Sequence, residues 1–398
     1  MLLPYASDRP PMRWPYMTWA LLCLNAALFL WTWIAARRGG WWQAEAIYNT
    51  VGIVPAHFRP FTLLTYAFFH AGLAHLLINL FYLWVFGGGV EEAIGPGRLL
   101  LLYLASGAFG GLLEYWVTVA VLQQPGLMAQ PIVGASAACA GLIGVFAVRY
   151  YRARLSFVGL PWRPHVVTVV TLFLALEIGT GLRDIWVGSG AGGAAHWTHV
   201  GGFVFGLVWA QAFRLGEAGE RAYLRADALQ AMEKNVPGAA IKRWESLLAR
   251  EPNNLTARVE LARAWLLLGD REQAGQHYLA ALQGYLSHNR RAEAARLYAE
   301  MREHDLPAQG LSAAQRYFLA GALEEGEQPA FAAETYRALT VHEPDAPEAE
   351  LALLKAASLY VHRLNRREEA RILLRLFLER YPHSQWRSLA EDLQRAVT

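Results

Sequence analysis

Six polar side chains that could carry out chemistry lie within or beside apolar stretches of the sequence. Polar and ionisable groups inside a membrane-spanning segment cost free energy, so each one is a candidate for a functional role. A serine near a histidine is the pairing of a nucleophilic catalyst, because the hydroxyl is a weak nucleophile until a base takes its proton. The six candidates are His70, His75, Asn79, Ser136, His196 and His199.

Ser136 is the candidate nucleophile and His199 the candidate base, since histidine exchanges protons near neutral pH. His75 and Asn79 are spaced i, i+4 and would share one face of a helix. Together with the backbone N–H of Ser136 they could donate hydrogen bonds to the oxyanion of a tetrahedral intermediate. No acidic residue near His199 in the sequence suggests a third member, so we predict a Ser–His dyad.

Each candidate also has a purely structural interpretation. A lone serine in a membrane helix usually bonds back to a carbonyl or packs as a small residue, and a lone histidine usually packs in a core. We expect at most a secondary role for His70 and His196, which could hold water near the site or lie at the interface. Glu114 and Glu177 are expected to pair with neighbouring helices and take no part in chemistry.

The sequence gives little reason to expect a metal or another cofactor. His196 and His199 are spaced i, i+3, but no HExxH motif occurs and no carboxylate lies beside them. Cys23 and Cys139 both lie in apolar runs, so we predict no disulfide, and a packed thiol at Cys139.

Six apolar stretches could position these residues. The chain has 398 residues, of which 55% are hydrophobic and only 17% are charged, and charges are sparse before about Leu215. A helix that crosses the hydrocarbon core needs about 20 mostly apolar residues. The stretches that qualify are 17–36, 72–90, 99–122, 131–148, 165–182 and 195–214. The first reads as a retained span and not as a cleaved signal peptide.

Helix geometry brings the candidates to a common depth. Spans two, four and six would enter from the same face, with their polar residues about 6–12 Å below that boundary. Small residues surround Ser136, and Gly202 and Gly206 share the face of His199. Small residues let membrane helices approach closely, so we predict that spans four and six pack against each other and bring Ser136 near His199.

Arginine placement predicts the orientation in the membrane. The arginines on the side assigned to the cytosol are Arg9, Arg13, Arg98, Arg149, Arg152, Arg154 and Arg163. Both termini would then be cytosolic, although Arg37, Arg38 and Arg59 in the first outer connection oppose this assignment. That connection, 37–71, is rich in aromatic residues and is expected to lie in the outer interface. The preference for arginine over lysine suggests a bacterial plasma membrane.

The second half predicts a soluble helical domain, so we divide the chain into domains 1–215 and 216–398. A small residue followed four positions later by a large one recurs there, a pattern we call the small–x–x–x–large step. Its four instances are Ala240 with Trp244, Ala274 with Tyr278, Ala332 with Tyr336, and Ala370 with Leu374. This pattern resembles tetratricopeptide repeats, whose period is about 34 residues, at 238–283 and 313–382, with the middle left open. Such repeats would bind a protein partner; the alternative is a stabilising appendage. A net charge of +3 gives no indication of nucleic-acid binding.

Three segments resemble the motifs of the rhomboid proteases: residues 58–98, GASAACAGLIG at 134–144 and AHWTHVGGFVFG at 195–206. The resemblance implies an all-α chain, with a six-transmembrane-helix rhomboid bundle followed by the soluble repeat domain. It implies an intramembrane serine endopeptidase that cleaves transmembrane protein substrates near the outer boundary of the lipid bilayer. The family's roles fall on Ser136 as nucleophile, His199 as base, and His75 with Asn79 at the oxyanion.

The resemblance also extends to a turn and includes two departures. Glu91 and Gly95 match the family's structural turn after the second helix. Ala137 stands where glycine is common, and Ala140 stands where some members place an aromatic ring against the histidine, which puts that support of His199 in doubt.

Two other functions remain open at the level of sequence. The first is a catalytically inactive rhomboid-like protein that binds transmembrane segments and scaffolds partners, against which the presence of both Ser136 and His199 argues. The second is a small-solute transporter, which is disfavoured because the polar residues cluster near one face and not at the bilayer midplane.

Overall fold

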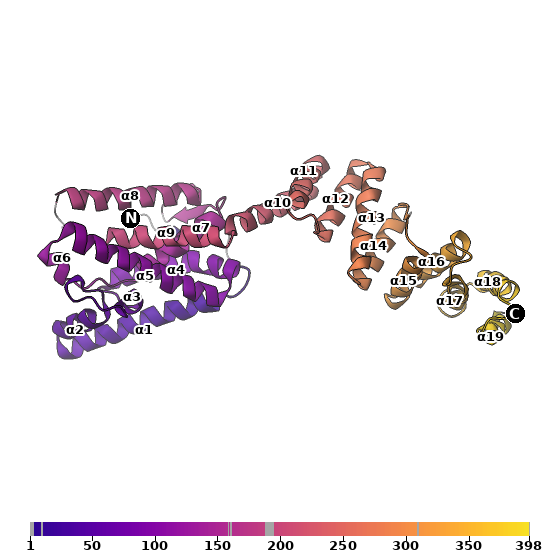
Figure 1. The fold of residues 1–398 in the computed structure, drawn as a ribbon, viewed down its shortest axis with the longest axis horizontal. Coiled ribbons are helices and arrows are strands. Elements are labelled where there is room, and N and C mark those ends of the chain that lie inside the picture. The colour runs from indigo at the N-terminus through magenta and orange to yellow at the C-terminus, as the bar shows by residue number, and fades with distance from the viewer. Residues whose placement is uncertain are drawn as a thin grey trace. The chain divides into compact units, whose positions relative to one another are not determined.

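Helices make up nearly all of the structure, a computed structural model that describes residues 4–8, 11–157, 159, 161–187, 195–308 and 310–397. The chain divides into two compact units, Met1–Glu220 and Arg221–Thr398 (Figure 1). The two described strands, β1 (Pro4–Ser7) and β2 (Leu155–Phe157), form one short antiparallel pair, with Pro4 opposite Phe157. The predicted all-α fold class is therefore confirmed.

The helices of the first unit follow one another with short connections. They are α1 (Tyr16–Gly39), α2 (Trp41–Val51), η1 (Pro55–His57), α3 (Thr62–Thr65), η2 (Tyr66–Phe68), α4 (Leu73–Ile94), α5 (Pro96–Val117), η3 (Thr118–Leu122), α6 (Pro125–Ala129), α7 (Ser136–Arg149), α8 (Val166–Val187), α9 (His196–Ala212) and α10 (Leu215–Glu233). The division between the units falls within α10.

Four of the described helices are long and apolar enough to cross a membrane: Tyr16–Gly39, Leu73–Ile94, Pro96–Leu122 and Val166–Val187. They correspond to predicted spans one, two, three and five. The helices at predicted spans four and six are shorter, with 14 residues in α7 and 17 in α9. At 1.5 Å per residue, α7 is only about 21 Å long.

Helix α7 is shorter than the predicted stretch 131–148 because its first residues are not helical. Ile132 forms an isolated antiparallel bridge with Ile53. Gly134 then has a φ of 142°, a conformation that side chains with a Cβ rarely adopt. The helix therefore begins at Ser136, which lies at its N-terminus and not five residues into a span.

The turn after α4 has the structural role that the sequence suggested. Gly95, with a φ of 84°, ends α4, and Pro96 begins α5. The buried Glu91 carboxylate accepts hydrogen bonds from the backbone N–H groups of Met17 and Thr18, at 3.0 and 2.8 Å. These N–H groups belong to the first turn of α1 and lack helical partners, so Glu91 caps that helix and ties it to α4.

Glycines allow α5, α7 and α9 to pack backbone to backbone (Figure 1). A Cβ added at Gly202 of α9 would lie 2.0 Å from the carbonyl oxygen of Ala137 in α7, and one at Gly206 would lie 2.1 Å from that of Gly141. A Cβ at Gly110 of α5 would lie 2.4 Å from the Thr198 carbonyl oxygen. The predicted close contact between spans four and six is confirmed.

The second unit continues α10 with nine described helices that pack on their neighbours along the chain. They are α11 (Pro237–Arg250), α12 (Leu255–Leu268), α13 (Arg271–Ser287), α14 (Arg291–Glu303), α15 (Ala313–Glu325), α16 (Pro329–His342), α17 (Ala349–His362), α18 (Arg367–Arg380) and α19 (Arg387–Val397). Neighbours along the chain pack against each other from α11 to α19, as helical repeats do.

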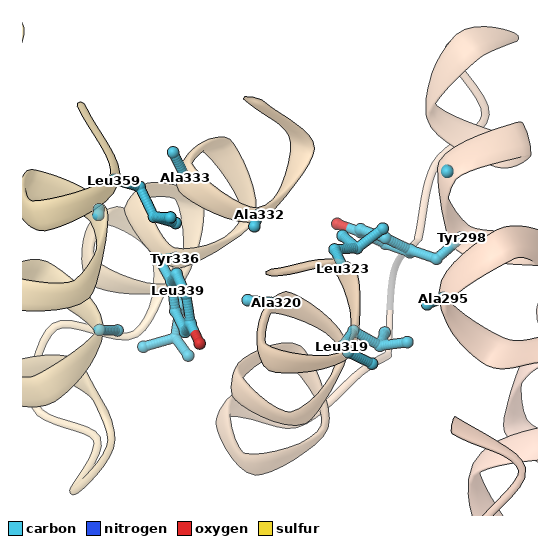
Figure 2. Packing of buried hydrophobic residues seen from close by; sticks show 14 of the residues in the cluster. Ala295, Tyr298, Leu319, Ala320, Leu323, Ala332, Ala333, Tyr336, Leu339 and Leu359 are labelled. Carbon is cyan, nitrogen blue, oxygen red and sulfur yellow. The ribbon is translucent and has the colours of Figure 1, made fainter. Parts of the chain in front are cut away.

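The small–x–x–x–large step lies in the core of this unit. All eight residues of the four predicted pairs are at most 1% exposed. Figure 2 shows Ala332, Tyr336 and Leu339 of α16 beside Ala320 of α15. The middle region that the sequence left open has the same packing, since α14 buries Ala294 and Tyr298 to 0% and 3% exposure.

One polar network links three consecutive helices of the second unit. Arg263 of α12 donates two hydrogen bonds to the Glu300 carboxylate of α14, both at 2.7 Å, and the Tyr278 hydroxyl of α13 donates a third at 2.6 Å. Burial acts to raise the pKa of Glu300, but the hydrogen bonds from Arg263 and Tyr278 outweigh it and leave the pKa below its usual value of 4.5. The ionised carboxylate therefore stabilises this part of the fold.

We expect Glu300→Gln to weaken α13 and α14 by about 1–3 kcal/mol at neutral pH, because charge-assisted hydrogen bonds are lost. A carboxyl group with a lowered pKa stabilises the fold above its unfolded value, near pH 4.5, and loses that contribution as the pH falls through its folded value. The difference between wild type and variant should therefore shrink on acidification below that point. Amide hydrogen exchange of α13 and α14 in the full chain measures this difference in stability at each pH.

The matched control for this experiment is Glu293→Gln. Glu293 lies on the same helix and pairs at the surface with Arg290. Exposed pairs contribute little, so this variant should keep the wild-type protection. Equal protection of wild type and Glu300→Gln at neutral pH would contradict the stabilising role of the network.

Candidate active site

A single cavity of about 430 Å³ collects most of the predicted site residues. Its walls come from α4, α5, α7, α8 and α9, and from the segment between α6 and α7. The predicted residues that line it are His75, Asn79, Ser136, His196 and His199. Helices far apart in the sequence thus bring a serine hydroxyl, an amide and three imidazoles to one cavity.

Ser136 is the first residue of α7, and its side chain is half-buried at the cavity wall. The preceding backbone is held in place, since the Gly134 N–H donates to the Tyr66 carbonyl at 3.0 Å and the Ala135 N–H donates to His70 Nε2 at 3.3 Å. The first N–H groups of a helix lack helical partners and attract negative charge. The N–H groups around Ser136 can therefore stabilise an oxyanion.

His70 supports the loop before Ser136 and lies outside the cavity lining. It is 1% exposed, and its Nε2 accepts the hydrogen bond from Ala135, so this nitrogen is unprotonated. Its ring meets the His75 ring edge to face at a centroid distance of 5.3 Å. The geometry places His70 behind the backbone that precedes Ser136, and not among the residues that line the cavity.

His75 and Asn79 lie on one face of α4, as their spacing predicted. The His75 ring packs on the backbone of Gly134, where an added Cβ would lie 2.7 Å from Cε1 of the ring. Gly134 therefore leaves room for the imidazole beside the start of α7. The Asn79 amide donates to the His75 carbonyl at 3.0 Å, which fixes the orientation of a buried side chain.

His199 enters the cavity from the first turn of α9. In the described part of the chain, Ser136 and His199 line this one cavity without a hydrogen bond between their side chains, and such bonds often tighten only when substrate binds. Nδ1 of His199 lies 2.9 Å from Oε2 of Glu177 in α8. The ring N–H points off the line to that oxygen, so the contact is a close electrostatic one and not a well-aligned hydrogen bond.

Two buried carboxylates bind the start of α9. Oε2 of Glu114 accepts hydrogen bonds from the Thr198 N–H and hydroxyl, at 3.0 and 3.1 Å. Oε2 of Glu177 lies 2.8 Å from Nδ1 of His196. The expectation that both glutamates pair with a neighbouring helix is confirmed, and His196 lines the cavity as part of this polar cluster.

Sequence reasoning missed the residues of α8 that face His199. The sequence predicts helix pairing for Glu177 and no part in chemistry, and Glu177 lies 22 positions before His199. Phe173, one turn earlier on α8, has its ring centroid 6.1 Å from that of His199. The available signal was the acidic residue in an otherwise apolar span, which is a functional candidate by default.

Comparison with known proteins shows what the first unit is similar to. Residues 57–215 match the Rhomboid domain family. RHOMBOID-like protein 4 of Arabidopsis thaliana is 34% identical over 149 residues, which is 37% of this chain and 32% of that protein. Rhomboid protease GluP of Bacillus subtilis is 29% identical over 157 residues, which is 39% of this chain and 27% of that protein.

Rhomboid protease GlpG of Klebsiella pneumoniae is 30% identical over 99 residues, 25% of this chain and 34% of that protein. The chain thus spans about a third or less of the length of each of these three relatives. Residues 57–215 are therefore similar to rhomboid domains, in a chain with four described helices long and apolar enough to cross a membrane.

Proposed function

We propose that this protein is an intramembrane serine endopeptidase that hydrolyses peptide bonds in or beside transmembrane segments of membrane proteins. The observation that carries the proposal is the single cavity lined by Ser136, His199, His75 and Asn79, within a rhomboid domain. Two of the relatives are themselves called rhomboid proteases. A serine at a helix N-terminus and an imidazole on a facing helix are the parts that acyl transfer needs.

The chemistry proceeds in two stages without a cofactor. Ser136 Oγ attacks the carbonyl carbon of the scissile bond while Nε2 of His199 takes the hydroxyl proton. The oxyanion receives hydrogen bonds from the Ser136 N–H and from His75 and Asn79. The imidazolium then protonates the leaving amine as the C–N bond breaks. Water, deprotonated by His199, then attacks the acyl-enzyme carbonyl. The imidazolium returns that proton to Ser136 Oγ as the ester C–O bond breaks, which releases the carboxylic acid product and free Ser136.

The remaining assignments follow from this function and the arginine pattern. The repeat-like second unit recruits a substrate or a protein partner on the cytosolic side, where both termini lie. The division into domains 1–215 and 216–398 remains part of the proposal. The plasma membrane and a bacterial origin remain predictions, since the relatives come from a plant and from bacteria.

The test is cleavage of a transmembrane reporter by the purified full-length protein in detergent, with a fluorophosphonate probe for the nucleophile. We expect cleavage that a chelator does not affect, and probe attached at Ser136 in peptide mass spectra. Absence of both cleavage and labelling by folded protein, across several reporters, would overturn the proposal. That result would favour the inactive protein that binds transmembrane segments.

A further inference from the structure

We propose that Glu177 of α8 is the positioning residue of the catalytic base and forms, with Ser136 and His199, a three-residue arrangement instead of a dyad. This inference rests on the proposed proteolytic function, in which His199 takes and returns the proton. The structure brings the Glu177 carboxylate, from a helix that supplies neither nucleophile nor base, to the side of the imidazole.

The placement of Glu177 is costly unless the carboxylate has partners. Its side chain is only 10% exposed, and it interrupts an apolar helix long enough to cross a membrane. A carboxylate in such a segment needs hydrogen bonds or opposite charge to offset its lost hydration. Oε2 meets both Nδ1 of His199, at 2.9 Å, and Nδ1 of His196, at 2.8 Å.

Once aligned, the contact would select one tautomer of His199. A proton on Nδ1, facing the carboxylate, leaves Nε2 unprotonated and free to act as the base toward Ser136. Among the described residues this buried nitrogen has no aligned hydrogen-bond partner, and Glu177 Oε2 lies 2.9 Å from it. A small rotation of the ring would align its N–H with Oε2, and active-site bonds commonly tighten in this way when substrate binds.

Other charged groups around His199 do not fill this position. Oε2 of Glu114 is occupied by the backbone and hydroxyl of Thr198. Asp184 lies on the side of His196, 3.9 Å from its Nε2. His75 of α4 faces the same cavity but can offer only an imidazole.

The same face of α8 also supplies the ring contact that Ala140 of α7 cannot provide. Phe173 and Glu177 are spaced i, i+4, and the Phe173 ring lies against the His199 ring. One turn further, Gly181 packs on Trp197 of α9, where an added Cβ would lie 3.0 Å from the indole. Glycine at this position lets α8 come close enough for Glu177 to reach the first turn of α9.

The proposal predicts a selective loss of catalytic rate in Glu177→Gln, with partial recovery in Glu177→Asp. We expect kcat to fall by about 10- to 100-fold while KM changes by less than about twofold, because the substrate is not touched. Fluorophosphonate labelling of Ser136 should slow by a similar factor, since it needs the same base but no peptide substrate. The control Arg183→Gln removes a charge from an exposed position of α8 and should match wild type.

Labelling is measured on the full-length protein in isolated membranes, so the result does not depend on surviving extraction into detergent. An active wild type with an equally fast Glu177→Gln variant would overturn this inference and leave the proposed function intact. Equal losses in Glu177→Gln and Glu177→Asp, together with an equal loss of thermal stability, would also overturn it, because the role would then be structural. An inactive and unlabelled wild type would overturn both.

Discussion

Replacing His199 by glutamine should lower the rate of reporter cleavage by about a thousandfold or more while the membrane unit stays folded. A positioned general base contributes about 10²–10⁴ to the rate, and the glutamine amide cannot accept the proton of Ser136 at neutral pH. The side chain is only partly buried in the cavity wall, so a residue of similar size can replace it. Single-turnover cleavage by the full-length protein measures the effect.

The sharper form of this test combines His199→Gln with Ser136→Ala. If the two residues act as one unit, removing either should cost about as much as removing both. A double variant whose loss equals the product of the two single losses would show that they act separately. His165→Gln, at an exposed position near the start of α8, is the matched control and should cleave at the wild-type rate.

Helix spacing was sufficient to predict which residues meet in the cavity. His75 and Asn79 share a helix face because i and i+4 always do, and the glycines after His199 indicate which side of α9 approaches α7. These inferences depend only on the geometry of single helices. The structure places the four residues around one cavity for the same reasons.

The start of α7 could not be read from composition, since residues 131–135 are as apolar and small as those that follow. It is set by a pairing between Ile53 and Ile132, which are 79 positions apart, and by the φ of Gly134. Long-range contacts of this kind override local helix preference. Their effect is to make Ser136 the first residue of the helix, where N–H groups are free to donate.

Glu177 and Phe173 escaped prediction because no local pattern connects them with α9. Their relation to His199 depends on how α8 packs on α9, which Gly181 permits by leaving room for Trp197. Ala140 had suggested that the histidine lacks an aromatic support. In this fold the ring nearest the histidine comes instead from another helix, at Phe173 of α8.

In the second unit, the small–x–x–x–large step correctly predicted buried positions because alanine lets neighbouring helices approach while the larger residue fills the space between them. Ala294 and Tyr298 do not fit the regular period of the predicted repeats, yet both are buried in the same manner. A period counted along the sequence is broken by changes in loop and helix length. The packing of neighbouring helices is not disturbed by these changes, because each helix still needs to bury one face.

The contact between α7 and α9 makes Gly202→Ala the second variant with a large expected effect. The new Cβ would lie 2.0 Å from the oxygen and 2.8 Å from the carbon of the Ala137 carbonyl group. Both sides of this contact are helix backbone, so the helices must separate by about 1 Å or more to reach ordinary C···O distances. Overpacking of this kind costs about 1–3 kcal/mol.

The separation would fall between nucleophile and base, since Gly202 follows His199 by one turn and Ala137 follows Ser136 directly. A misplacement of 1 Å can cost about 100-fold in rate, so we expect a fall of that order in kcat together with a lower thermal midpoint. Gly179→Ala in α8 adds the same methyl group where no atom lies within 4 Å, and should keep both values. If Gly202→Ala keeps the wild-type kcat and thermal midpoint, the methyl group is accommodated without moving either helix. The backbone contact of α7 and α9 would then not position Ser136 and His199.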